Sequence, residues 1–339
     1  MNIRDIAKLS GVSAATVSRV INNPSSVNQK TRERILAVME EYHYTPNIFA
    51  RSLNDKRTNT VGILCSEIYD INHSKIISIL EHQLRANGYD SLLCSTGEQI
   101  PYNKKFLNLL AQKQVASIMI IGSHYSDTKD FALIYDIARH IPIIVLNGYI
   151  DVPGVYNIIC DEKKIMRELV MELFQQGCRH LYYLEDNDTY SAYQKRSGFW
   201  EGVQACGIKH LCKCISIPID SDELFHAKKQ IELHLSKKQA IDAILSADDI
   251  LAVGALQALT QAGIQIPVIG FNNSDYAICC TPYLTSVDNR MDFISRSAVD
   301  TLLHVLNGED ALEQITVSAK LVERDTYKRP FPASFTIDV

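Results

Sequence analysis

Residues 3–23 read IRDIAKLSGVSAATVSRVINN, and this stretch decides how the first part of the chain folds. Apolar residues recur at helical spacing over residues 3–9, and Gly11 follows as a helix-terminating residue. Ser13 is a suitable N-cap for a second helix, AATVSRVI, which ends at the turn-forming NNPSS. Because two short helices are joined by a tight turn that contains glycine, the stretch predicts a helix-turn-helix.

A third helix is predicted over residues 28–44, NQKTRERILAVMEEYHY, which carries an apolar stripe and stops before Pro46. Residues 1–46 therefore form the expected head domain. The following segment, residues 47–58, is short and polar at its end, and we interpret it as a hinge with one amphipathic turn.

Charge is distributed unevenly along the chain. Residues 1–60 contain nine basic and five acidic residues, a net charge of +4, so the remainder carries −9 of the overall −5. Each phosphate that a basic side chain neutralises releases counterions. The pattern favours a head that contacts a nucleic-acid backbone and a body that binds something else.

After residue 59 the pattern changes to apolar, β-rich runs that alternate with helical stretches, which is typical of parallel sheets with helical crossovers. The predicted strands are 60–65, 90–94, 116–122, 141–147, 180–186, 213–218, 240–248 and 266–272. They form two successive βα arrays, so the predicted fold is a helical helix-turn-helix head, a hinge and an α/β body of two similar lobes. Ligands bind beyond the carboxyl ends of such strands, where this chain has SEIYD, GSHYS, NGY, EDNDTY, ADD and FNNSD.

The body is expected to span residues 59–330 and to be followed by a tail, residues 331–339. The expected first lobe comprises about 59–157 plus 288–318. The expected second lobe comprises about 158–287 plus 319–330.

Several classes of protein are disfavoured. No stretch approaches the ~18 uninterrupted apolar residues of a membrane span, and MNIRDIAKLSG lacks the apolar core of a secretion signal. Nine irregularly spaced cysteines then indicate reduced thiols. We expect a cytoplasmic protein without disulfides or membrane association.

The segment 206–214, CGIKHLCKC, is the one candidate metal site. Alternation along a strand would place His210, Cys212 and Cys214 on one face, but the usual close pairing of cysteines is missing. The chain also has no phosphate-binding loop and no G-x-S-x-G or H-E-x-x-H motif. We therefore predict no metal, no cofactor and no enzymatic activity.

The chain closely resembles the lactose/galactose-repressor family of bacterial transcription regulators along essentially its whole length. The resemblance is carried by IRDIAKLSGVSAATVSRVINN and TRERILAVMEEYHYTPNIFARSL, and in the body by LRANGYDSLL, IPIIVLN, LAVGALQAL, VIGFNNSD, PYLTSVD and LVERDT. It implies a homodimer whose heads bind a near-palindromic operator in double-stranded DNA and whose lobes enclose a small effector. YKRPFPASFTIDV lacks the leucine heptads of tetrameric members, which favours a dimer.

The resemblance also implies which residues contact DNA. Ala14, Ala15 and Arg19 correspond to base-contacting positions, and an arginine can bond guanine O6 and N7 together. Leu53 matches the hinge leucine that enters the minor groove as an apolar wedge. Short polar side chains suited to phosphates or groove edges are Thr16, Ser18, Asn22 and Asn23.

Eight positions match the effector cleft of the family: Tyr69, Asp70, Asn72, His73, Asn147, Lys195, Asp248 and Asn272. Members that bind sugars commonly have an acid where Asn147 and Asn272 stand. They have asparagine at Asp248 and arginine at Lys195. An aromatic residue common near position 220 is also missing. Amides, carboxylates and tyrosines still bond hydroxyl groups, so a sugar or sugar derivative remains the predicted effector.

The resulting hypothesis is a transcription regulator, a repressor of carbohydrate-metabolism genes, controlled by a small molecule. A solute-binding protein of a transport system shares the two-lobed body but leaves the helix-turn-helix unexplained. A regulator controlled by a partner protein is a third alternative, because several cleft residues depart from the family pattern.

Overall fold

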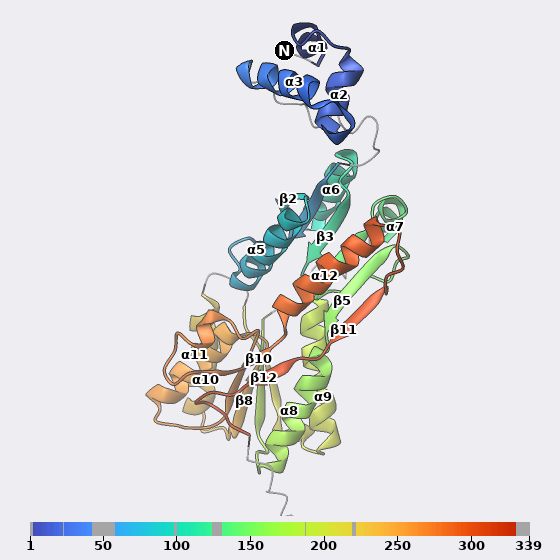
Figure 1. Cartoon of the computed structure of the whole chain (residues 1–339). Coiled ribbons are helices and arrows are strands. Elements are labelled where there is room, and N and C mark those ends of the chain that lie inside the picture. Colours follow the sequence, from blue (N-terminus) through green and yellow to red (C-terminus); the bar gives the residue numbers. More distant parts are fainter. Residues whose placement is uncertain are drawn as a thin grey trace, which may run out of the picture. The chain divides into compact units, whose positions relative to one another are not determined.

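The computed structural model describes residues 3–22, 24–42, 58–97, 100–123, 131–186, 188–218 and 222–329. The predicted hinge up to residue 57 and the predicted tail lie outside these ranges. The helical head and the two-lobed body form separate units (Figure 1). Each unit is therefore described by itself.

The head contains the three predicted helices. They are α1 (Ile3–Leu9), α2 (Ala14–Asn22) and α3 (Gln29–Glu41), with a 3-10 turn η1 (Pro24–Ser26) before α3. The hydroxyl of Ser13 accepts a hydrogen bond from the Thr16 amide at 3.2 Å, and Asn28 caps α3 through the Lys30 amide at 3.0 Å. The helices enclose a small core of Ile6, Ala7, Val17, Val20 and Ile35.

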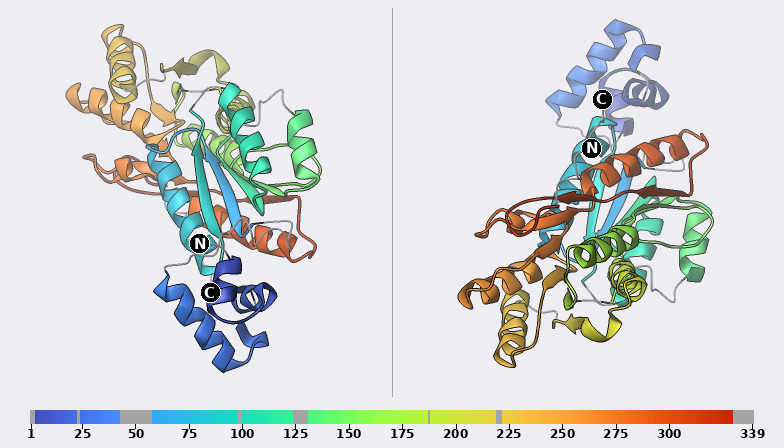
Figure 2. Two further views of the ribbon diagram at one scale, coloured as in Figure 1. Left: turned by 90° about the horizontal axis from the view of Figure 1, so that it is seen from above. Right: turned by 90° about the horizontal axis from the view of Figure 1, so that it is seen from below.

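The first lobe is built on a six-stranded parallel sheet in the order β11-β5-β4-β3-β1-β2. Its strands are β1 (Thr60–Cys65), β2 (Asp90–Ser95), β3 (Ser117–Ile121), β4 (Ile143–Leu146), β5 (Val155–Cys160) and β11 (Gln314–Val317). The helices of this lobe are α5 (Ile71–Ala86), α6 (Ile100–Gln112), α7 (Phe131–Ala138) and α12 (Met291–Leu306). Apolar faces of α5 and α12 pack on one side of the sheet, in the cluster that contains Leu80, Ile121 and Leu302. Figure 2 shows helices on both sides.

The second lobe repeats the pattern with the order β12-β10-β9-β8-β6-β7. Its strands are β6 (Leu181–Glu185), β7 (Lys213–Ser216), β8 (Ala243–Ser246), β9 (Val268–Phe271), β10 (Thr285–Asp288) and β12 (Lys320–Val322). Its helices are α8 (Glu162–Gln175), α9 (Tyr190–Ala205), α10 (Glu223–Ser236) and α11 (Asp249–Gln261), with short 3-10 turns η2 (Lys209–Leu211) and η3 (Asp275–Ala277). Helices α8 and α9 cover one face, and α10 and α11 cover the other.

The chain passes between the two sheets three times: after β5, after β10, and between β11 and β12. All eight predicted strands are present, which confirms the predicted fold class. Four strands were not predicted: β5, β10, β11 and β12. Among the residues that the structure describes, no helix is long and apolar enough to cross a lipid bilayer.

Candidate functional site

Helix α2 presents one buried and one outward face. Val17 and Val20 lie in the core of the head, whereas Ala15 and Arg19 are exposed. An exposed guanidinium on the second helix of a helix-turn-helix is placed to reach base edges or phosphates.

Three of the other predicted DNA-contacting residues are less exposed than Ala15 and Arg19. Ala14 is half-buried and packs against the head core. The Thr16 hydroxyl lies 2.9 Å from that of Ser13 and takes part in the cap of α2. Ser18 is half-buried, and Asn22 is the last residue of α2. Asn23 and Leu53 lie outside the described residues.

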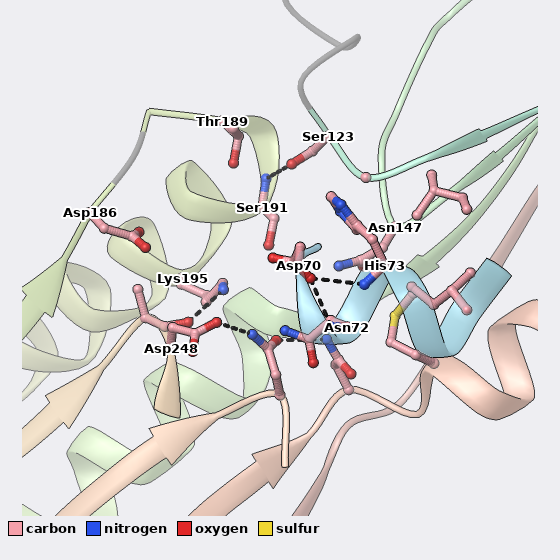
Figure 3. A pocket seen from close by; sticks show the side chains of 17 residues that line it. Asp70, Asn72, His73, Ser123, Asn147, Asp186, Thr189, Ser191, Lys195 and Asp248 are labelled. Carbon is pink, nitrogen blue, oxygen red and sulfur yellow. Dashed lines mark hydrogen bonds between the residues drawn. The ribbon is translucent and has the colours of Figure 1, made fainter. Parts of the chain in front are cut away.

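The body has a cavity of about 140 Å³ at the carboxyl ends of strands from both lobes (Figure 3). Seven of the eight predicted effector residues line it: Asp70, Asn72, His73, Asn147, Lys195, Asp248 and Asn272. Tyr69 is 86% exposed and does not belong to the lining. A neighbouring cavity of about 700 Å³ shares four lining residues with the first: Asn72, Asn272, Asn289 and Met291.

The N-terminus of α5 brings Asp70, Asn72 and His73 to the cavity. Asp70 caps the helix by accepting hydrogen bonds from the Asn72 and His73 amides, both at 2.8 Å. His73 Nδ1 lies 3.0 Å from the Glu67 carbonyl oxygen, which can only accept, so this nitrogen carries the proton. In the neutral side chain, Nε2 of His73 is therefore a hydrogen-bond acceptor. This atom lies close to Gly122, where an added β-carbon would be 3.2 Å from it.

Lys195 enters the cavity from α9. Its Nζ donates to the Ala247 carbonyl at 2.8 Å and lies over the Phe271 ring. The side chain is buried, so these two contacts offset part of the cost of removing an ammonium group from water.

A chain of side-chain hydrogen bonds connects Asp248, Asn272 and Asn289. Asp248 caps α11 through the Ile250 amide at 3.1 Å, and its other oxygen accepts from Asn272 Nδ2. Asn289 Nδ2 donates to Asn272 Oδ1 at 2.9 Å. Burial, and next the charge of Asp249, raise the pKa of Asp248 well above its usual range.

Asn147 and Asn272 each follow a strand with left-handed backbone, at φ of 52° and 89°. Asparagine is one of the few side chains that tolerates this region. Asn147 Oδ1 accepts from the Cys160 amide at 3.2 Å, and its Nδ2 donates to Glu162 Oε1 at 3.1 Å. Both amide groups are therefore held in one orientation.

Sequence reasoning missed part of the cavity. The lining also includes Ser123, Asp186 and Thr189. They belong to the segments GSHYS and EDNDTY, two of the strand ends where the sequence predicts ligand binding. Asn289 and Met291 carried no such indication, because β10, the strand before them, was not predicted.

The strand expected through the cysteine-rich segment 206–214 is only partly correct. His210 lies in the 3-10 turn η2, so the alternation that would align it with Cys212 and Cys214 does not occur. Within the described ranges, no group of three or more His, Cys, Asp or Glu residues is arranged to hold a metal ion.

Comparison with known proteins identifies both parts of the chain. The model for bacterial regulatory proteins of the lacI family matches residues 2–47, and a periplasmic binding protein-like domain matches residues 170–327. An HTH-type transcriptional regulator from Lachnoclostridium phytofermentans is 38% identical over 339 residues, which cover 96% of this chain and 99% of that protein. The chain belongs to the LacI family.

The fold of this LacI-family chain is that of solved family structures. The Lac repressor dimer bound to operator and the anti-inducer ONPF has a TM-score of 0.83 at 24% identity, covering 96% of this chain and 98% of that one. The complex of the transcriptional regulator CelR with cellobiose has a TM-score of 0.67 at 22% identity, covering 96% and 100%. This LacI-family protein is a DNA-binding transcriptional regulator, and its relatives are regulators rather than enzymes.

Proposed function

We propose that this LacI-family regulator is a cytoplasmic repressor of carbohydrate-metabolism genes, with its operator affinity controlled by a sugar or sugar derivative in the cavity. The observation that carries the proposal is the cavity itself. Amide, carboxylate, hydroxyl and ammonium groups from both lobes line it. The same chain has a helix-turn-helix head.

The chemistry of the cavity wall favours a ligand with many hydroxyl groups. Each hydroxyl can donate to a carboxylate and accept from an amide or ammonium group. The lining has the carboxylates of Asp70 and Asp186 against one lysine, Lys195. Burial raises the pKa of Asp248, so this third carboxyl group adds hydrogen-bonding atoms more than negative charge. A neutral ligand therefore fits better than a phosphate ester or a sugar acid. The neighbouring cavity leaves room for a second ring or substituent beside the first sugar.

For DNA binding, we assign the head to residues 1–46 and place α2 in the major groove. Arg19 bonds a guanine, while the neighbouring short side chains hold the helix against the backbone. Leu53, in the hinge, opens one base step from the minor groove. The protein acts as a homodimer, as the Lac repressor structure does, and two heads related by a two-fold axis require a near-palindromic operator.

Control by the effector is a population shift. A ligand that bonds both lobes stabilises one relative arrangement of them, and it changes operator affinity only by its differential affinity for the two arrangements. Operator and sugar must therefore change each other's affinity by the same factor.

The proposal is tested by selecting operators from a random duplex library with the full-length protein. Binding of the selected duplex is then titrated at two salt concentrations, with and without D-glucose, D-galactose, D-ribose, D-xylose and cellobiose. We expect a near-palindromic consensus, salt-dependent affinity and a shift in affinity with at least one sugar. Selection without a consensus would contradict the operator proposal. Binding that no sugar changes would favour control by a partner protein.

A further inference from the structure

Glu162 is a buried carboxylate beside the cavity that the proposed function does not use. It is the first residue of α8, and only 2% of it is exposed. Its Oε1 accepts a hydrogen bond from Asn147 Nδ2 at 3.1 Å, and its Oε2 accepts one from the Ser191 hydroxyl at 2.5 Å. A buried carboxylate is costly without such donors, so Glu162 depends on both.

The two donors belong to different lobes. Asn147 follows β4 of the first lobe, whereas Ser191 lies in α9 of the second. Helix α9 packs tightly on α8, since a β-carbon added at Gly198 would lie 2.2 Å from the Lys163 carbonyl oxygen. Glu162 and Ser191 therefore move together, and the hydrogen bond from Asn147 crosses from one lobe to the other.

Two more contacts cross between the lobes at this place. The Ser191 amide donates to the Ser123 hydroxyl at 3.2 Å (Figure 3). The rings of Tyr149 and Tyr190 are stacked, with centroids 5.9 Å apart. Ser123, Asn147 and Ser191 all line the cavity, whereas Glu162 lies behind it. Glu162 therefore contacts cavity-lining residues of both lobes, so a change in the cavity wall would alter the contacts between the lobes.

Glu162 also decides which hydrogen-bonding groups the cavity wall offers. The Ser191 hydroxyl gives its hydrogen to Glu162, so it can only accept from a ligand. Asn147 uses its oxygen for the Cys160 amide and one amide hydrogen for Glu162, which leaves one hydrogen to donate.

We propose that Glu162 is a positioning residue that links the two lobes and orients Asn147 as a donor and Ser191 as an acceptor toward the effector. The effector part of this statement rests on the proposed function. The link between the lobes does not, and it can be tested without effector or DNA.

Exchanging the donor and the acceptor tests the link. Asn147→Asp places two carboxylates against each other, and Glu162→Gln removes one of two acceptor oxygens. In the double variant, the amide introduced at position 162 donates to the carboxylate introduced at position 147. The remaining oxygens still accept from Ser191 and from the Cys160 amide, so every hydrogen bond has a partner again.

The full-length variants are compared by thermal unfolding and by hydrogen exchange of the Ser191 amide, which reports the contact with Ser123. We expect Asn147→Asp to lower the unfolding midpoint by about 5 °C and to speed this exchange roughly tenfold. The double variant should return both values to near wild type.

Glu168→Gln is the matched control, since Glu168 is an exposed residue of the same helix and should change neither value. Additive losses in the double variant would overturn the proposed hydrogen bond. A lower midpoint with unchanged exchange at Ser191 would show a role in stability alone and overturn the link between lobes. Neither result depends on operator or sugar binding, so failure here is distinct from failure of the proposed function.

Discussion

The ammonium nitrogen of Lys195 lies 4.6 Å from the centroid of the Phe271 ring. A cation from α9 therefore lies over the last residue of β9. Lys195 is only 7% exposed. The Ala247 carbonyl takes one of its three hydrogens, so the others are available to groups in the cavity. Lys195 is therefore held in place before any effector binds.

Lys195→Met should remove the response to sugar while leaving operator binding intact. Methionine fills a similar apolar volume but has no hydrogen to donate to a hydroxyl group. We expect at least a tenfold loss in sugar affinity, measured by calorimetry with whichever sugar shifts operator binding. Lys213→Met is the control, because Lys213 also lies over an aromatic ring, that of Tyr182, but does not line the cavity. Equal losses in both variants would contradict the assignment.

We expect Asp249 to make the stability of the second lobe depend on pH. It is fully buried and accepts hydrogen bonds from the Ser274 amide, the Ser274 hydroxyl and the Ser286 hydroxyl. Burial outweighs these bonds and raises the pKa of Asp249 to about 6. Between the unfolded and folded pKa values the native state therefore keeps a proton that the unfolded state has lost, so stability falls as the pH rises.

Asp249→Asn should remove this dependence. The unfolding free energy of the wild type minus that of the variant should decrease by about 2 kcal/mol from about pH 4.5 to about pH 7.5. Urea unfolding can be followed by the fluorescence of Trp200, the single tryptophan, which packs against the core of this lobe. A difference that stays constant or grows with pH would show that Asp249 does not titrate as described.

Arg19→Ala should weaken binding to the selected operator more than binding to random DNA. Losing a bidentate contact with guanine costs about 1–3 kcal/mol, or roughly a 5- to 150-fold loss of specific affinity. Arg34→Ala is the control, because Arg34 is an exposed arginine of α3. Fluorescence anisotropy measures the affinity of each variant for the operator duplex and for a scrambled duplex. An equal loss on both duplexes for Arg19→Ala would identify a phosphate contact instead.

Leu53→Ala tests the hinge leucine, which the sequence alone proposes. An apolar wedge contributes only where the operator is bent, so specific affinity should fall while the salt-dependent binding to random DNA stays nearly unchanged. Titrations on both duplexes at two salt concentrations measure this. Comparable losses on both would exclude the wedge.

Several of the strands that sequence reasoning found have continuous apolar runs. TVGILC and ASIMIIG gave β1 and β3, whose residues are almost all buried. β11 and β12 were missed because QITV and KLV are short and partly exposed, and they exist only through pairing with β5 and β10. Such pairing depends on residues far away along the chain, which a local pattern does not report.

The candidate site shows the same division. Asp70, Asn147, Lys195, Asp248 and Asn272 were found because polar residues at strand ends and family positions are local features. Glu162 was missed, because in CDEKKIM it has the pattern of an ordinary exposed helix start. In the folded chain it is buried and contacts Asn147 of the first lobe and Ser191 of the second.

The sequence by itself determined the helix-turn-helix, the two alternating arrays and the positions where a ligand would be bound. The helix-turn-helix and the arrays follow from turn chemistry, helix caps and apolar periodicity, all of which act over a few residues. The ligand positions follow from polar strand ends and from the resemblance to the family. Only the tertiary structure decided that seven of the eight predicted effector residues share one cavity, that Tyr69 does not, and that Glu162 joins Asn147 to Ser191. Burial and hydrogen-bond partners come from segments distant in sequence, and they exist only once the two sheets have packed.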